Sequence, residues 1–340
     1  MRYRTLGRSG TVVSTYALGT MTFGVETDEE TSHAILDSYL DVGGNLIDTA
    51  DVYGHGASEE IVGSWLAKHP ADRGRVVVAT KGRLGMGSAP NDLGSSRVHL
   101  GRALDASLAR LGVEQIDLYQ MHSWDPLTPL DETLRFLSDS VSNGKIAHFG
   151  FSNYVGWEIA KAAHIVDRLG LNPPVTLQPQ YNLLVREIEA EIIPACLDTG
   201  LGILPWSPLA AGWLTGKYQR DSAPDPATRM GENPERGSEA WRVRNAKERT
   251  WRIIDAVREV ADAREVPMSR VALAWVEARP AVTSVILGVR TPEQFDDNIA
   301  AADLELTPEE SDHLTEVSRP DFPGYPYGDT GTVLRGRPLP

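Results

Sequence analysis

Short runs of consecutive apolar residues alternate with longer amphipathic segments along most of the chain. Apolar runs such as residues 76–78 are typical of strands that are buried on both faces of a parallel sheet. Segments in which apolar residues recur every three or four positions are typical of helices that pack one face against such a sheet. Eight strands are expected, at residues 15–18, 45–48, 76–80, 116–121, 146–150, 175–178, 202–205 and 283–288. Because most of them are followed by a helical segment, the pattern predicts an α/β fold of the (β/α)8 TIM-barrel type.

Capping residues mark several helix boundaries. Thr27, with Glu30 three positions later, predicts a capping box that opens the first helix. The pair Gly43–Gly44 predicts its end. Thr291 and Pro292 predict the N-cap and the first turn of a helix directly after the last strand. Further helices are expected from residue 58 onward and over residues 98–111, 129–143, 155–169, 187–199, 249–264 and 269–278.

Segments rich in glycine, proline and charge interrupt this alternation. Residues 1–14 alternate around two glycines and predict a β-hairpin. Residues 82–96 and 208–248 predict long loops at the C-terminal face of the barrel, where the sites of such folds are built. The tail over residues 320–340 is rich in proline and glycine and is expected to be irregular. With no tandem repeat or low-complexity run, we expect a single domain over residues 1–340.

Composition and charge narrow the classes of function. The 340 residues are 41% hydrophobic and 24% charged, as is usual for a soluble globular protein. The formal net charge of −14 argues against binding to nucleic acid or to an anionic membrane surface. Cys196 is the only cysteine, which fits a reducing compartment. No apolar run approaches the roughly 18 residues that span a bilayer, and residues 1–10 lack a signal core, so a cytoplasmic protein is expected.

Polar side chains follow three successive predicted strands. Asp48 ends the strand at residues 45–48, and Tyr53 lies just beyond it in a glycine-rich turn. Lys81 and His122 end the next two apolar runs. Because the C-terminal ends of parallel barrel strands lie on one face, we expect these four side chains to converge on one pocket. A carboxylate at a strand end is costly to bury without a cation, which Lys81 would supply.

The segments that carry these residues resemble the aldo-keto reductase family. The runs GNLIDTADVYG, ATK and LYQMH are followed by GFSN, QPQYNLL, PWSPLAAGWLTGKY and SVILGVRTPEQFDDN, in the family's order. The resemblance extends from about residue 2 to about residue 317, and is strongest to the branch of bacterial reductases and voltage-gated potassium channel beta subunits. It implies that the N-terminal hairpin plugs the bottom of the barrel. It also implies a catalytic tetrad of Asp48, Tyr53, Lys81 and His122.

The four residue types suit the reduction of a carbonyl group. Tyr53 is the expected general acid, and a nearby ammonium should lower its pKa of roughly 10. Lys81 would supply that charge while Asp48 keeps Lys81 charged and oriented. His122 would hydrogen-bond the carbonyl oxygen as a reduced nicotinamide delivers hydride. We expect no metal, because the chain has no ligand spacing such as HExxH.

The later strand ends provide candidate contacts to the nicotinamide. The resemblance implies that Ser152, Asn153 and Gln178 bind its carboxamide. Trp206 ends the strand at residues 202–205 and offers an aromatic face on which the ring can stack. A buried core tryptophan is the competing interpretation.

A helix N-terminus after the last strand favours an anion. Arg290 lies at this start and suits the 2′-phosphate that distinguishes NADPH from NADH. The competing interpretation is that Arg290 pairs with carboxylates of this acidic chain. We therefore expect NADPH (NADP+) as the cofactor. The resemblance implies further contacts to it from Gly19, Thr20, Met21, Asp48, Ser207, Pro208, Leu209, Ala210, Gly212, Lys217, Arg229, Gly288, Gln294 and Asn298.

Aromatic residues are candidates for the wall of the substrate pocket. Phe23, Trp124 and Trp213 are candidates for the mouth of the pocket, beside Tyr53 and His122, and suggest an apolar or ring-bearing small-molecule carbonyl compound. An oligomer is possible. Two other hypotheses remain: an NADP(H)-binding redox-sensing subunit resembling the channel beta subunits, with little turnover, and a barrel hydrolase or isomerase that uses Asp48 and His122 as acid and base.

Overall fold

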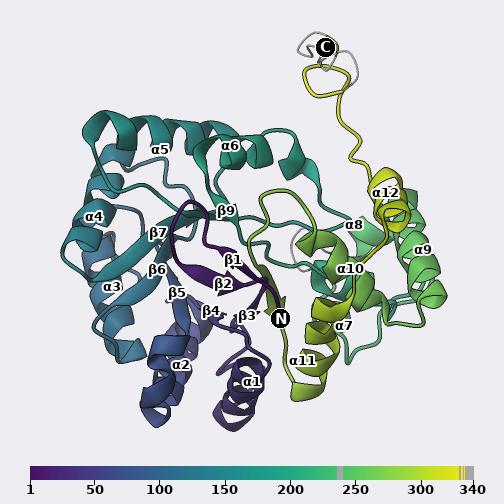
Figure 1. Ribbon diagram of the computed structural model, residues 1–340, viewed down its shortest axis with the longest axis horizontal. Helices are drawn as coiled ribbons and strands as arrows, with labels where there is room; N and C mark the ends of the chain where they lie inside the picture. The colour runs from purple at the N-terminus through teal and green to yellow at the C-terminus, as the bar shows by residue number, and fades with distance from the viewer. Residues whose placement is uncertain (236–239, 329–330, 332, 334–340) are drawn as a thin grey trace.

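The computed structural model describes residues 1–235, 240–328, 331 and 333, and its centre is a ring of eight parallel strands (Figure 1). Neighbouring strands follow the order β10-β3-β4-β5-β6-β7-β8-β9, so the strands from β3 to β9 pair in chain order, and β10 pairs with β3. Their bounds are β3 Tyr16–Gly19, β4 Leu46–Asp48, β5 Val77–Gly82, β6 Ile116–Met121, β7 Ile146–Ser152, β8 Thr176–Gln178, β9 Gly202–Ile203 and β10 Val285–Gly288. The eight strands confirm the predicted α/β class.

Hydrogen bonds between β9 and the segment that leads into β10 close the ring. Ile203 forms a parallel bridge with Val282. The Thr283 amide donates to the Ile203 carbonyl at 2.8 Å, and the Ile286 amide donates to the Pro205 carbonyl at 3.0 Å. Because the sheet is closed, the C-terminal ends of all eight strands face one side. The fold is therefore a (β/α)8 TIM barrel, as predicted.

An N-terminal hairpin covers the opposite end of the barrel. Strand β1 (Tyr3–Thr5) pairs with β2 (Val12–Ser14) in antiparallel register, and the two lie across the ring of strands in Figure 1. Its turn presses onto the barrel at Gly7, where an added Cβ would lie 2.0 Å from the Val175 carbonyl oxygen. Leu6 and Val13 of the hairpin pack there with small and branched apolar side chains of the barrel: Ala17, Leu46, Ala79, Leu118, Val175, Leu204 and Ile286. The predicted hairpin plug is thus present.

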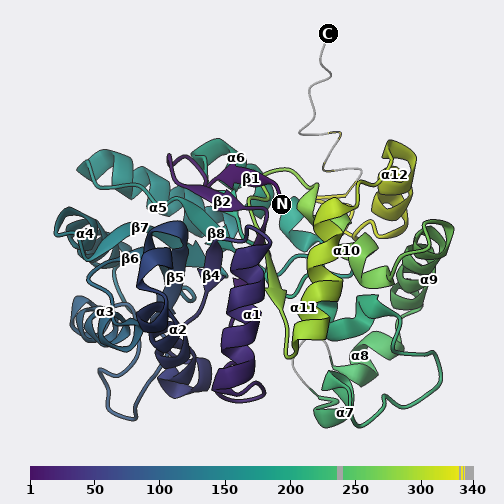
Figure 2. The same ribbon diagram turned by 60° about the horizontal axis from the view of Figure 1, so that its bottom comes forward.

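Helices form the outer layer (Figure 2), and the larger ones are α1 Glu29–Asp41, α2 Ala57–Lys68, α3 Arg97–Leu111, α4 Leu130–Ser142, α5 Gly156–Leu169, α6 Ile192–Thr199, α9 Glu248–Ala263, α10 Met268–Glu277, α11 Pro292–Ile299 and α12 Pro308–Val317. The predicted capping box at Thr27 is wrong. The N-cap of α1 is Asp28, whose Oδ1 accepts from the Thr31 amide at 2.8 Å. Thr27 is buried and its hydroxyl donates to the Arg290 carbonyl instead.

Helix α12 was not expected from the sequence pattern. Its start carries a capping box between Thr307 and Glu310, with Pro308 in the first turn. These signals are local and readable, but only Leu314 of the helix is buried, so the apolar periodicity that identifies a helix is weak. Among the described residues, no helix combines the length and apolar character needed to cross a membrane.

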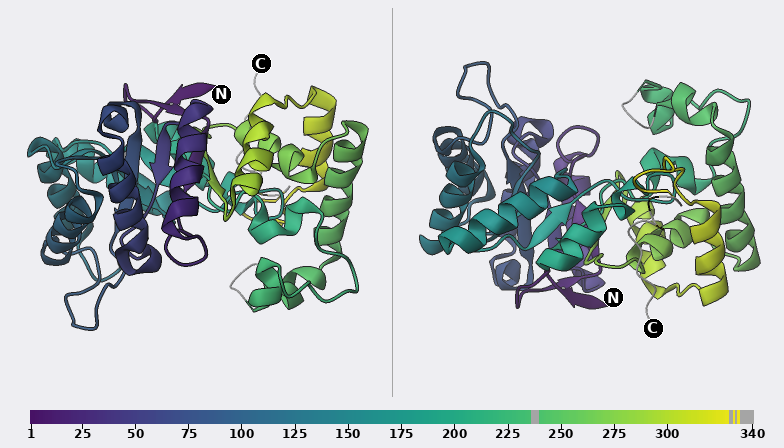
Figure 3. Two further views of the ribbon diagram at one scale, coloured as in Figure 1. Left: turned by 90° about the horizontal axis from the view of Figure 1, so that it is seen from below. Right: turned by 90° about the horizontal axis from the view of Figure 1, so that it is seen from above.

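The two long loops lie on the side of the barrel opposite the hairpin (Figure 3). The segment after β9 is not a plain loop, because it contains η4 (Ala210–Thr215), α7 (Arg229–Glu232) and α8 (Trp241–Asn245). Residues 236–239 of the predicted 208–248 segment lie outside the described part of the chain. The tail has turns but no helix or strand over residues 320–328, and its prediction beyond that point falls mostly outside the described residues.

Candidate active site

A buried lysine holds the centre of the site at the C-terminal end of β5. The Lys81 Nζ atom donates to Asp48 Oδ2 at 2.7 Å, to the Thr49 carbonyl at 2.8 Å and to the Tyr53 hydroxyl at 3.2 Å. The Lys81 side chain has no exposed surface and that of Asp48 is 3% exposed. An ammonium has three N–H donors, so this arrangement uses all of them and neutralises a buried charge.

Tyr53 is placed by a tight turn after β4. It begins the 3-10 turn η1 (Tyr53–Gly56), in which Gly54, His55 and Gly56 have φ angles of 58°, 53° and 100°. Helix α2 starts directly afterwards, so these left-handed residues reverse the chain within one turn. The phenol ring meets the His122 imidazole edge to face, with ring centroids 5.9 Å apart. Three consecutive barrel strands therefore bring all four predicted catalytic residues together.

Burial and charge act in opposite directions on the pKa values of Lys81 and Tyr53. Burial alone would lower the pKa of Lys81, but the Asp48 carboxylate and the Tyr53 hydroxyl hold that pKa above its ordinary value. Burial raises the pKa of Tyr53 and outweighs the opposing effect of the Lys81 charge. The expected net lowering of the Tyr53 pKa is therefore wrong for this structure, because the phenol loses more hydration than the ammonium restores. Tyr53 is a neutral phenol that still holds its proton.

His122 lies beside Lys81 and Tyr53 and is a neutral base. Burial, and then the charges of Lys81 and Arg83, lower the pKa of His122 to about 3. Its Nδ1 atom is buried and has no hydrogen-bond partner among the described residues. Its backbone is fixed on both sides, since its amide donates to the Gly82 carbonyl and its carbonyl accepts from the Asn153 side chain, both at 3.0 Å. A neutral imidazole has one N–H group, which can donate a hydrogen bond to a carbonyl oxygen.

A chain of side-chain hydrogen bonds extends the site across β7, β8 and β9. Gln178 Nε2 donates to Asp48 Oδ1 at 2.8 Å, and the Ser152 hydroxyl donates to the Gln178 carbonyl at 2.9 Å. Asn153 Nδ2 donates to the Ser152 hydroxyl at 3.1 Å. Trp206 Nε1 donates to Asn153 Oδ1 at 3.0 Å. The four residues assigned to the nicotinamide are thus joined to the Asp48–Lys81 pair.

Arg290 is surrounded by carboxylates. Its guanidinium forms ion pairs with Glu26, which follows β3, and with Glu232 Oε2 of α7 at 3.1 Å. Its amide donates to Gln294 Oε1 at 3.0 Å, and the Gln294 amide donates to the N-cap hydroxyl of Thr291. The contacts with Glu26 and Glu232 agree with the competing interpretation of Arg290 from the sequence. Both carboxylates lie on other elements and are partly exposed.

Further cations lie near Arg290 on the segment after β9. The pKa of Lys217 is lowered by burial and by the neighbouring charges of Arg290 and Arg229. Lys217 folds back over Gly212, where an added Cβ would lie 2.3 Å from Lys217 Cε. The backbone before it is tightly wound, with left-handed φ angles at Ser207, Ala210 and Ala211. A group of cations beside a narrow glycine-bearing turn fits the phosphates of a dinucleotide.

Two of the three predicted mouth residues lie elsewhere. Phe23 and Trp213 are fully buried, so neither faces the opening of the barrel. Trp213 is stacked on Trp241 with ring centroids 4.9 Å apart, inside an aromatic cluster that sequence periodicity could not reveal. Trp124 is half-buried after β6 and meets Trp157 of α5. Trp157 was not predicted, because one exposed tryptophan in a helix carries no local signal.

The remaining residues that were predicted to contact the cofactor lie around the C-terminal face of the barrel. Thr20 is buried, and its amide and hydroxyl both donate to the Asp48 carbonyl, at 2.9 and 3.1 Å. Met21 and Gly288 are exposed at the ends of β3 and β10. Asn298 is buried within α11. Gly19 packs against Ile286, and Pro208 and Leu209 lead from Trp206 into η4.

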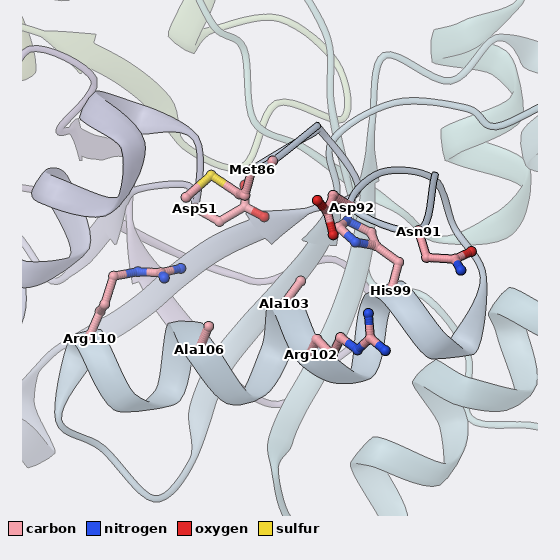
Figure 4. Close-up of a pocket in the computed structure, with 10 residues that line it drawn as sticks. Asp51, Met86, Asn91, Asp92, His99, Arg102, Ala103, Ala106 and Arg110 are labelled. Atoms are coloured by element: carbon pink, nitrogen blue, oxygen red, sulfur yellow. The ribbon is translucent and has the colours of Figure 1, made fainter. Parts of the chain in front are cut away.

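A cavity of about 250 Å³ lies outside the barrel wall, between α3 and the loop after β5 (Figure 4). Asp51 and His99 border it, and their buried atoms Oδ1, Oδ2 and Nε2 have no hydrogen-bond partner among the described residues. Burial, followed by the charge of Glu59, raises the pKa of Asp51 to about 7. The Asp51 amide donates to the Lys81 carbonyl, so this cavity lies behind the site rather than within it.

Comparison with known proteins places the chain in a family. The sequence profile described as "Aldo/keto reductase family" matches residues 16–319. The chain is 38% identical to the uncharacterized oxidoreductase YrpG of Bacillus subtilis, over 97% of this chain and 98% of that protein. It is 36% identical to versiconal hemiacetal acetate reductase of Aspergillus parasiticus (93% and 96%), and 35% identical to a probable voltage-gated potassium channel subunit beta of Arabidopsis thaliana (95% and 99%).

The chain belongs to the aldo/keto reductase family. This class of barrel proteins comprises oxidoreductases that act on small molecules and generally use nicotinamide cofactors. Membership therefore confirms the predicted family and its general role as a reductase.

Proposed function

We propose that this protein is an NADPH-dependent reductase that converts an aldehyde or ketone to an alcohol, with Tyr53 as the proton donor. The observation that carries the proposal is Lys81, which joins Asp48 and the Tyr53 hydroxyl through hydrogen bonds of 2.7 and 3.2 Å inside a buried site. A hydrolase needs an activated water or nucleophile, and this geometry activates a phenol instead.

Side chains of the protein would polarise the carbonyl group and transfer the proton. A reduced nicotinamide, when bound, supplies the hydride for the carbonyl carbon. The Tyr53 hydroxyl and the neutral His122 imidazole polarise the carbonyl oxygen by hydrogen bonding. The Tyr53 O–H bond then breaks as the O–H bond of the alcohol forms. Lys81 stabilises the resulting phenolate, and Asp48 keeps Lys81 charged and in place.

The residues near Arg290 support NADPH over NADH. Arg290, Lys217 and Arg229 would hold the phosphates, with Arg290 facing the 2′-phosphate that NADH lacks. Trp206, fixed by its hydrogen bond to Asn153, would provide the surface for the nicotinamide ring. Gln178 would bind the carboxamide, because its side-chain oxygen accepts no hydrogen bond within the described part of the chain.

Fluorescence titration with NADPH and NADH tests the cofactor assignment. Binding should quench tryptophan emission, and NADPH should bind more tightly than NADH. Arg290→Ala should weaken NADPH binding by about tenfold or more, since a charged hydrogen bond is lost, and should change NADH binding much less. Equal losses for both nucleotides would contradict the role of Arg290 at the 2′-phosphate.

Turnover tests the reductase assignment against its main alternative. A regulatory subunit that binds the nucleotide is the second candidate, because a potassium channel beta subunit matches this chain over nearly its full length. NADPH oxidation should depend on added carbonyl compound, and Tyr53→Phe should lower turnover by about 10²- to 10⁴-fold without weakening NADPH. Binding of NADPH without turnover of any aldehyde or ketone would favour the regulatory subunit.

A further inference from the structure

Arg83 has a strained backbone at the mouth of the barrel. It follows Gly82, the last residue of β5, whose carbonyl accepts the hydrogen bond from the His122 amide. Its φ angle is 109°, in the region that favours glycine. Such a conformation costs an ordinary side chain free energy and is concentrated at functional sites, where the surrounding structure maintains it. The strained arginine two residues after Lys81 is therefore a candidate for a functional residue.

The guanidinium of Arg83 is only partly engaged. One nitrogen, Nη2, donates to the Trp124 carbonyl at 2.8 Å, while Nε is buried without a partner. Within the described residues no carboxylate forms an ion pair with it. Asp125 directly follows Trp124, and its carboxylate accepts from the Ser95 and Leu127 amides and from the Thr128 hydroxyl. Arg83 thus keeps a charge and N–H groups available at this mouth.

Aromatic rings surround the same opening. Trp124 meets Tyr154 and Trp157 edge to face, with ring centroids 5.4 and 5.3 Å apart. Trp157 is 55% exposed, so this wall faces solvent at its outer end. Lys161 Nζ lies 5.7 Å from the ring centroids of Trp124 and of Trp157. Arg83 and Lys161 thus contribute two positive charges beside these rings.

We propose that Arg83 binds an anionic group of the substrate, so that the protein reduces planar or ring-bearing carbonyl compounds that carry a carboxylate or phosphate. This inference rests on the proposed function. Arg83 holds the anion through its free N–H groups, and the rings of Trp124 and Trp157 contact the apolar part. His122 and Tyr53 take the carbonyl oxygen on the other side of the same opening. Arg83 is a specificity residue, since it takes no part in the hydride or proton transfer.

The charge of Arg83 already acts on the reacting site. It contributes, after burial and Lys81, to the lowered pKa of His122. A purely structural role would need only the hydrogen bond to the Trp124 carbonyl. Loss of that bond would affect an acid and its uncharged ester alike, so the acid-to-ester ratio in Arg83→Gln separates charge from structure.

The test compares an acid with its ester. Wild-type protein and Arg83→Gln are assayed with NADPH and either 4-carboxybenzaldehyde or its methyl ester, which has the same ring and carbonyl but no charge. The ratio of kcat/KM for the acid to that for the ester should fall about tenfold or more in Arg83→Gln, mainly through KM. Arg83→Lys should recover part of the ratio. Arg102→Gln, an exposed arginine on the outer α3, should leave the ratio unchanged.

Each outcome separates the two proposals. An acid-to-ester ratio that stays within about twofold of the wild-type value in Arg83→Gln would overturn the role of Arg83 while leaving the reductase assignment intact. The same conclusion follows if Arg83→Gln lowers acid and ester turnover equally, because that result marks a structural role. Absence of turnover with both aldehydes and with a panel of neutral ketones would instead overturn the proposed function. Benzoate gives an independent check, since its inhibition of ester reduction should weaken in Arg83→Gln.

Discussion

At the scale of single residues, the site depends on one lysine with no exposed surface. Lys81 has an acceptor for each of its three N–H groups, and two of those acceptors are the side chains of Asp48 and Tyr53. A buried ion pair contributes little to stability as a pair, but removing one partner leaves a charge without compensation. The same contacts that place Lys81 beside the Tyr53 hydroxyl therefore also hold β4 and β5 together at their ends.

A double-mutant cycle tests this dependence. Lys81→Met should destabilise the protein by about 3–5 kcal/mol, because the Asp48 carboxylate remains buried without a cation. Asp48→Asn combined with Lys81→Met should recover a substantial part of this loss, since neither charge remains. Urea unfolding of the two single variants and the double variant measures the coupling. Strictly additive losses would show that the two side chains do not stabilise each other.

Asp51 gives a pH dependence of stability. Its pKa is raised to about 7 by burial and by Glu59. Below about pH 3 the carboxyl group is protonated in both folded and unfolded chains. As the pH rises toward 7, the unfolded chain loses this proton while the folded protein retains it, so stability falls by roughly 4 kcal/mol in total. Above that range the loss is complete.

Asp51→Asn should remove this effect. The variant should gain stability over the wild type as the pH rises from about 4 to about 8, with a difference of a few kcal/mol at the upper end. Urea unfolding at a series of pH values, with turnover measured in parallel, provides the comparison. If the difference between variant and wild type is the same at every pH, Asp51 does not titrate in this range.

At the scale of elements, the segment after β9 is connected to the barrel through Arg290. Glu232 of the short helix α7 and Glu26 after β3 both contact its guanidinium. On the proposed function, a 2′-phosphate at this position would replace at least part of these contacts. The carboxylates would then set how strongly the site discriminates between NADPH and NADH, besides holding α7 near the end of β10.

Glu232→Gln isolates this competition. Removing one carboxylate from Arg290 should tighten NADPH binding by several-fold, of the order of the 0.5–1 kcal/mol of an exposed ion pair, and should affect NADH less. Glu235→Gln is the matched control, because Glu235 is an exposed carboxylate on the same segment. Weaker NADPH binding in Glu232→Gln would mean that the ion pair retains the cofactor instead of competing with it.

At the scale of the whole molecule, the hairpin and the barrel form one packed unit. Gly7 has a φ angle of 55°, and an added Cβ would meet the Val175 carbonyl at 2.0 Å and the Gly202 amide at 2.8 Å. Both contacts are backbone atoms of the barrel floor and cannot move aside. The hairpin thus closes the end of the barrel opposite the catalytic face.

Gly7→Ala should therefore be strongly destabilising. We expect a loss of about 2 kcal/mol or more, from backbone strain and overlap together, with NADPH affinity near normal in the protein that still folds. Gly10→Ala is the control, because an added Cβ there meets nothing within 4 Å. Thermal unfolding of both variants tests the expectation. Similar melting temperatures for the two would contradict the close packing at Gly7.

The sequence by itself determined the eight β/α units, the hairpin and the convergence of Asp48, Tyr53, Lys81 and His122. Apolar periodicity and strand ends are local properties, and a parallel barrel places every strand end on one face. Two local predictions were wrong or missing. Asp28 accepts the cap hydrogen bond that was assigned to Thr27, and α12 has too small a buried face to be recognised.

The tertiary structure alone decided what surrounds each of these residues. It placed Phe23 and Trp213 in the core, gave Arg290 its two carboxylate neighbours and raised the pKa of Tyr53 despite the Lys81 charge. The physical reason is common to all three. Burial and electrostatic environment are set by segments that lie far apart in the chain, and no local pattern of apolar and polar residues specifies which of those segments will meet.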